Sequence, residues 1–161
     1  MKAVERALNV IRAKYPGCTV EEICEREGIE IRRCEMGDGQ NGLYVSGRNS
    51  PVIFIKDSLN PQETHETLAH EILHHFDKPV DSMLSKRALK DPFLSYQGRK
   101  DDSRAETFAA LFLCPDVSDC ETYHDIMRKY NCSKELAKLR MKIEQGRMLG
   151  GIDDGVPKKE R

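Results

Sequence analysis

The stretch LAHEILHHFD, residues 68–77, places three histidines and a glutamate within six residues of an otherwise apolar segment. A helix turns about 100° per residue, so His70 and His74 lie on one face, whereas His75 is turned about 140° away from His70. Glu71 lies beside the pair. Four apolar residues take the other face of the predicted helix: Ala69, Ile72, Leu73 and Phe76. One side of this helix can therefore be buried while another presents His-Glu-x-x-His.

This spacing is the pattern of metalloproteases, in which two imidazoles bind zinc through their neutral nitrogens. The glutamate is turned too far round the helix to be a ligand and takes a proton from the attacking water. We therefore predict Zn²⁺ as the cofactor, His70 and His74 as metal ligands, and Glu71 as the catalytic base. The alternative is a surface helix with incidental histidines, which chance would produce in roughly one such chain in a hundred. His65 and His75 are expected at the surface or as supports of the ligands.

A catalytic zinc has three protein ligands and one open position. The helix predicted over 101–113 begins with acids, and Asp102 and Glu106 lie four residues apart on one stripe. We predict Asp102 as the third ligand, with Glu106 as the alternative or as the group that holds a ligand histidine. Asp101 and Asp102 could instead cap the helix and interact favourably with its dipole.

The composition fits one compact domain. The chain has 161 residues, 39% hydrophobic and 33% charged, and we predict a single domain over 1–149 with a disordered polar tail over 150–161. A net charge of −1 without long runs of like charge gives no reason to expect nucleic acid or a membrane as a partner. The N-terminal segment lacks a continuous apolar region, so we expect no signal peptide and a cytoplasmic location.

The six cysteines include no C-x-x-C pair. This spacing argues against zinc-ribbon and thioredoxin-like sites. In a reducing compartment the expected state is free thiols.

Hydrophobic periodicity and turn residues predict an α+β fold, a small three-stranded antiparallel sheet packed on a helical bundle. A first helix is expected to end near residues 16–17, and Thr19 and Glu22 form a capping box that opens a short helix closed by Gly28. The remaining predicted elements are strands at 28–34, 43–46 and 52–56, helices at 63–76, 101–113, 118–130 and 133–147, and a long connection over 80–100 with one possible helical turn.

Four segments carry a resemblance to a known family: EEICEREGIEI (21–31), TLAHEILHH (67–75), AETFAALFLCP (105–115) and NCSKELAKLRMKI (131–143). In these segments the chain resembles the ImmA/IrrE family of zinc metallopeptidases, which occur in mobile elements, prophages and stress responses. By position, the resemblance also places the ligand on Asp102 and its support on Glu106. The family pattern has a glutamate at the first of these positions and Asn or Asp at the second, so the longer and the shorter acid have changed places in this chain. Arg104 stands where members commonly have another acid.

The resemblance implies a zincin-like core and a gluzincin-like, thermolysin-like site that cuts a transcriptional repressor, a helix-turn-helix protein, at one place. In such sites an extended substrate pairs with a strand edge, and 52–55 could serve as that edge or be an ordinary buried strand. Tyr96, Tyr123 and His124 are candidate donors to the oxyanion.

The sequence leaves two alternatives to a peptidase. One is a binding module of the same fold that sequesters a regulator without cutting it. The other is DNA binding through residues 133–143 as a recognition helix, which the near-neutral charge argues against. The substrate, the activating signal and the oligomeric state are not encoded in any motif.

Overall fold

The structure is a computed structural model that describes residues 1–46, 50–77 and 99–150, with side chains over 1–46, 50–77 and 103–148. Within these ranges lie the helices α1 (Lys2–Lys14), α2 (Val20–Arg26), α3 (Pro61–Phe76), α5 (Arg99–Leu113), α6 (Tyr123–Tyr130) and α7 (Lys134–Gly150), and the strands β1 (Glu30–Cys34), β2 (Gly42–Ser46) and β3 (Pro51–Lys56).

The three strands form one mixed sheet in the order β1-β3-β2. The predicted α+β class is confirmed, but the sheet is not wholly antiparallel, because β1 pairs with β3 in parallel and only β2 pairs antiparallel. Successive strands alternate in direction, and β3 lies between the other two. The first and third strands are therefore neighbours that run the same way.

The position of β3 also corrects the prediction that residues 52–55 form an edge for substrate. Strand β3 is hydrogen-bonded on both sides, and Ile53 and Ile55 are fully buried. The alternative, an ordinary buried strand, is the one that the structure has. The edges of the sheet are β1 and β2.

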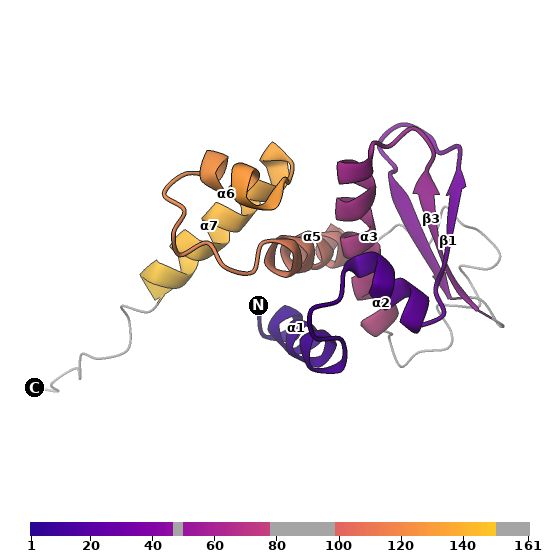
Figure 1. The fold of residues 1–161 in the computed structure, drawn as a ribbon, viewed down its shortest axis with the longest axis horizontal. Coiled ribbons are helices and arrows are strands. Elements are labelled where there is room, and N and C mark those ends of the chain that lie inside the picture. The colour runs from indigo at the N-terminus through magenta and orange to yellow at the C-terminus, as the bar shows by residue number, and fades with distance from the viewer. Residues whose placement is uncertain (47–49, 78–98, 151–161) are drawn as a thin grey trace, which may run out of the picture.

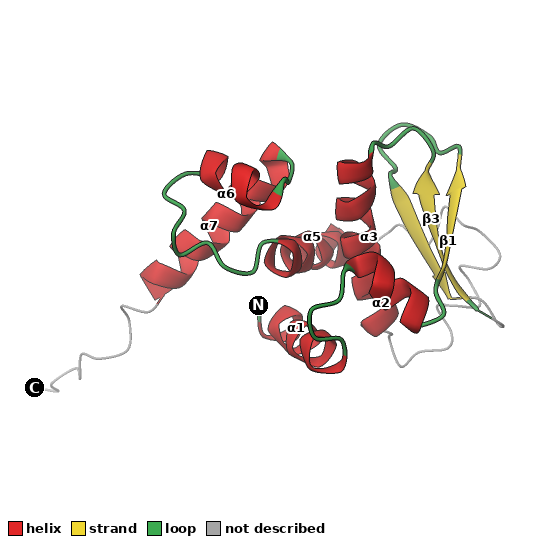
Figure 2. Ribbon diagram, viewed as in Figure 1, coloured by secondary structure: helices red, strands yellow, loops and turns green. Residues whose placement is uncertain are grey.

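Helix α3 lies between the sheet and α5 (Figure 1). Figure 2 shows the strands gathered on one side of the molecule, with α6 and α7 at the far end of α5. Of the four apolar residues predicted to face the interior, Ala69, Ile72 and Leu73 are buried and Phe76 is partly buried. The phase of α3 thus follows the pattern of its apolar residues.

The starts of two helices differ from the sequence prediction because of their caps. Helix α3 begins at Pro61, two residues before the predicted start, since Asn60 and Glu63 form a capping box and proline suits the first helical position. Helix α6 begins at Tyr123 and not at 118, because Thr122 and Asp125 form the same kind of box. The predicted box of α2 is confirmed.

Helix α7 is fixed at its start and near its middle. The Ser133 side chain accepts a hydrogen bond from the backbone of Leu136, which confirms the predicted cap. Glu66 of α3 accepts bonds from the Ser133 amide at 2.6 Å and hydroxyl at 2.7 Å. Arg140, only 2% exposed, donates to the carbonyl of Cys114 at 2.8 Å. These contacts connect α7 to both α3 and the end of α5.

Most of the connection predicted over 80–100, and the tail from 151 onward, lie outside the described residues. Helix α5 begins at Arg99, two residues before its predicted start. In the described part of the chain, no helix is both long and apolar enough to cross a bilayer.

Candidate metal site on helix α3

His70 and His74 lie together on α3. Their ring centroids are 5.7 Å apart, and the rings are inclined by 59°. Both side chains are half-buried. Two imidazoles on one tetrahedral zinc would have centroids roughly 5 Å apart, given ordinary zinc–nitrogen distances. The two predicted ligands are therefore close to the separation that a shared metal ion requires.

Glu71 is buried beneath strand β2, with 8% of its surface exposed. Its Oε2 accepts a hydrogen bond of 3.0 Å from the backbone N–H of Tyr44. This contact orients the carboxylate on the side of α3 that faces the sheet. The predicted base is thus held in place by a backbone amide.

The amide that Glu71 binds belongs to the outer edge of β2. The carbonyl of Asn41 accepts from the amide of Lys56, so odd-numbered residues of β2 face β3. The backbone groups of Gly42, Tyr44 and Ser46 consequently point away from β3. Glu71 lies at an edge of the sheet, although not the edge that the sequence suggested.

Gly42 allows α3 to lie close against strand β2. A Cβ at Gly42 would lie 2.5 Å from Cγ2 of Thr67 and 3.0 Å from Cγ of Glu71. Real side chains do not approach to 2.5 Å, so any larger residue must displace α3 or β2. The glycine is needed here for space and not for an unusual backbone angle.

Replacing Gly42 by alanine is therefore expected to destabilise the fold by about 1–3 kcal/mol, the usual range for overpacking. Urea unfolding measures the effect. Thr67→Ser removes the methyl group in closest contact and should restore part of the loss in the double variant. Gly146→Ala is the control, since nothing lies within 4 Å of that position. Equal stability of the Gly42→Ala and wild-type chains would contradict the close approach.

His75 is not a surface residue, which corrects one of the two expectations for it. Its side chain is 7% exposed. Its Nδ1 lies 3.0 Å from the hydroxyl of Tyr44, and its Nε2 lies 3.1 Å from Oε2 of Glu27. His75 thus contacts Tyr44, the residue whose backbone amide binds Glu71.

The carboxylate of Glu27 forms hydrogen bonds with three side chains. Lys14 lies 2.5 Å from Oε1, the hydroxyl of Tyr15 donates to the same oxygen, and His75 reaches Oε2. Burial by itself raises the pKa of Glu27, but the hydrogen bonds from these partners outweigh burial and lower the pKa to about 2. The carboxylate is therefore a stabilising anion that joins α1, α2 and α3.

Glu27→Gln is expected to cost on the order of 2 kcal/mol at neutral pH. The depressed pKa means that the contribution is complete above the ordinary value of 4.5 and is lost as pH falls toward about 2. Urea unfolding at several pH values should show the gap between wild type and variant shrinking over this interval. Glu25→Gln, an exposed change on the same helix, is the control. A gap that does not change with pH would contradict the assignment.

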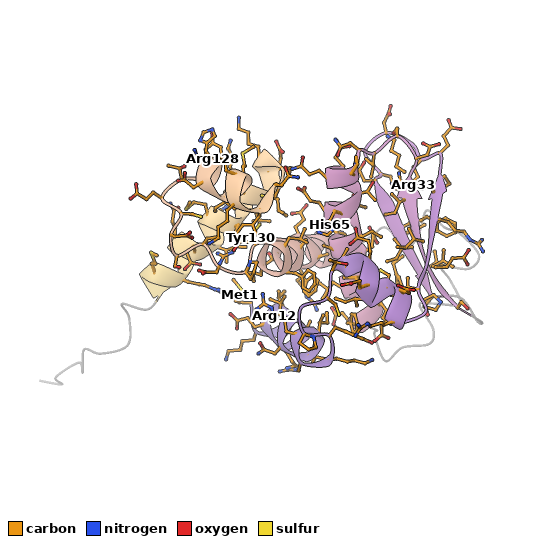
Figure 3. All side chains as sticks on the ribbon, viewed as in Figure 1. Met1, Arg12, Arg33, His65, Arg128 and Tyr130 are labelled. Carbon is orange, nitrogen blue, oxygen red and sulfur yellow. The ribbon has the colours of Figure 1, made fainter. Side chains whose placement is uncertain are left out.

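His65 is partly exposed, as expected, and pairs with Glu21 of α2. The distance from Nδ1 to Oε1 is 2.9 Å, and the hydrogen bond to Glu21 raises the pKa of His65. Figure 3 shows its side chain on α3. This histidine connects two helices.

Helix α5 carries the residues predicted to complete the metal site. The side chains of Asp101 and Asp102 lie outside the described residues, and Glu106 is exposed. Among the described residues, no group of three or more His, Cys, Asp or Glu could hold a metal ion. Arg104 forms an ion pair with Asp77 at the end of α3. The structure brings His70 and His74 together, whereas Glu106, whose side chain is described, does not form a group of three with them.

A match to a family model identifies the protein family of this chain. The model of the IrrE N-terminal-like domain, Peptidase_M78, matches residues 24–142. The chain belongs to this family. The resemblance inferred from the sequence motifs is thereby confirmed, and the IrrE-like match includes α3 and α5.

A solved structure described as a Mycobacterium tuberculosis transcriptional regulator is similar in fold to this IrrE-like chain. The TM-score is 0.57 at 18% identity, over 87% of this chain and 46% of that one. The IrrE-like chain thus spans about half the length of that protein. Comparison with curated proteins gives no match.

Sequence reasoning missed the residues of the IrrE-like domain that lie next to Glu71 and His75. Gly42 carried a usable signal, because glycine inside a strand often marks a close backbone approach. Tyr44 and Glu27 carried none, since their contacts with α3 join residues far apart in sequence. Of the candidate oxyanion donors, Tyr96 lies outside the described residues, while Tyr123 and His124 lie against each other at the start of α6.

Proposed function

We propose that this chain is a zinc-dependent endopeptidase that cuts a transcriptional repressor. His70 and His74 hold the metal in this proposal, Asp102 completes the site with Glu106 as the alternative, and Glu71 is the base. The observation that carries it is the histidine pair on one face of α3, next to a glutamate held at the edge of β2. Membership of a peptidase family supports the reaction class.

A zinc ion would supply a Lewis acid that polarises the scissile carbonyl and acidifies water. Glu71 accepts the proton of the attacking water and passes it to the leaving amine. An ionised carboxylate offers about four lone-pair positions, so the bond from Tyr44 orients Glu71 without preventing proton transfer. Burial beneath β2 keeps this carboxylate in one place during both steps.

The proposed substrate is a helix-turn-helix repressor. The family resemblance suggests this class, and the similar solved structure is itself described as a transcriptional regulator. The test is incubation of the zinc-loaded chain with candidate repressors, followed by mass measurement. One cut giving two fragments is expected. Intact repressor in every reaction, with one zinc per folded chain, would overturn the proposal.

A second candidate is a module that binds the regulator without cutting it. This chain has the shorter acid, Asp102, where the family pattern has glutamate, and the longer acid at Glu106. This favours the interpretation, since the shorter acid must bring the backbone closer to reach a metal. Recovery of a stable complex that contains intact repressor would support it.

A further inference from the structure

Two cysteines meet where α5 ends and α7 begins. Cys114 follows α5, and Cys132 lies between α6 and α7, 18 residues later. Their sulfur atoms are 3.8 Å apart, with 0% and 5% of the two residues exposed. The Cys114 thiol donates a weak hydrogen bond to the sulfur of Cys132, a contact that no sequence spacing revealed.

The backbone on each side of this pair is anchored. Arg140 binds the carbonyl of Cys114 at 2.8 Å. Ser133, the neighbour of Cys132, is held by Glu66 through two hydrogen bonds. The two sulfurs are therefore kept in contact by bonds that do not involve them.

We propose that Cys114 and Cys132 are an oxidation site at which a hydroperoxide forms a disulfide. A disulfide bond is about 2.05 Å long, so the sulfurs must close the remaining distance by side-chain rotation. The anchored backbones limit how far the two residues can move away from each other. This proposal does not depend on the proposed peptidase activity.

The two thiols differ in acidity. The hydrogen bond from the Cys114 thiol lowers the pKa of Cys132, whereas the same bond raises the pKa of Cys114. Cys132 is thus the thiol of the pair that ionises more readily, and the ionised form is the nucleophile in such reactions. Cys114 is the resolving thiol.

The reaction balances in two steps. The Cys132 thiolate attacks hydrogen peroxide, forming a sulfur–oxygen bond as the oxygen–oxygen bond breaks and hydroxide leaves. Cys114 then attacks the sulfenic sulfur, the disulfide forms, and water leaves with the Cys114 proton. Two thiols lose two electrons, and peroxide is reduced to water.

The disulfide would connect the end of α5 to the start of α7, which Glu66 already ties to α3. Closing this loop should raise the melting temperature by roughly 5–10 °C. A reductant such as dithiothreitol should reverse the shift.

The test exposes the full chain to hydrogen peroxide, then unfolds it with an alkylating agent present. Before alkylation, the mass of the oxidised chain should be about 2 Da below that of the reduced chain. Cys114 should be linked to Cys132. Trypsin cuts after Arg128 and Lys129 and so separates the two cysteines. Because Cys114 and Cys120 share one tryptic peptide, Cys120→Ser is used in parallel and should keep the link.

Cys24 is the matched control, since it is equally buried. Its thiol should stay reduced in peroxide and should be alkylated when the chain unfolds. Full alkylation of Cys114 and Cys132, under conditions that oxidise the more exposed thiols, would overturn the proposal. So would a link from either residue to another cysteine. In Cys132→Ser the temperature shift should be lost, and its persistence would equally contradict the assignment.

Discussion

Replacing His70 or His74 by alanine is expected to weaken zinc binding by more than about 100-fold, beyond the loss seen when only a supporting residue is removed. The two rings lie 5.7 Å apart on one face of α3, so each would provide one metal bond that no neighbour replaces. Competition with a chelating dye measures the affinity, and elemental analysis measures the stoichiometry.

His65→Ala is the matched control for this experiment. His65 lies on the same helix but pairs with Glu21, so its loss should leave zinc affinity within a few fold of wild type. Equal affinity in all three variants would show that zinc, if bound, is held elsewhere.

Glu71→Gln is expected to reduce cleavage by roughly 10²–10⁴-fold, the usual contribution of a general base. Glutamine has the same shape, and its carbonyl can still accept the bond from Tyr44. The fold and the metal should therefore be retained while the proton acceptor is lost. Single-turnover cleavage of a repressor, with zinc content measured on the same sample, separates these effects.

A Glu71→Gln chain that cuts at the wild-type rate would remove Glu71 from the mechanism. Glu63→Gln serves as the control, because Glu63 caps the start of the same helix and lies about two helical turns before His70.

Local pattern was enough to predict helix α3 and its orientation. The spacing of Ala69, Ile72 and Leu73 specifies the buried face, and helix geometry then places His70 beside His74. Both statements depend only on residues within one helix. The capping box of α2 and the cap of α7 were predictable for the same reason.

Strand order was not predictable in this way. The segment PVIFIK is equally compatible with an edge strand or a central one, because both are apolar and β-branched. Only its pairing with β1 on one side and with β2 on the other shows that it is central. The edge beside Glu71 consequently belongs to β2, whose sequence is less apolar.

The surroundings of Glu71 and His75 depend on contacts across the fold. Tyr44 reaches His75 from β2, and Glu27 reaches it from the end of α2. No periodicity links these residues. Helix geometry correctly turned His75 away from the pair, but it could not show that the side chain is buried against a carboxylate.

Zinc-edge anomalous diffraction from crystals of the zinc-loaded chain tests the central claim most directly. The account predicts one anomalous peak within about 2.1 Å of an imidazole nitrogen of both His70 and His74, with a carboxylate oxygen of Asp102 or Glu106 as the third ligand. A peak elsewhere, or histidines without metal at stoichiometric zinc, would contradict it.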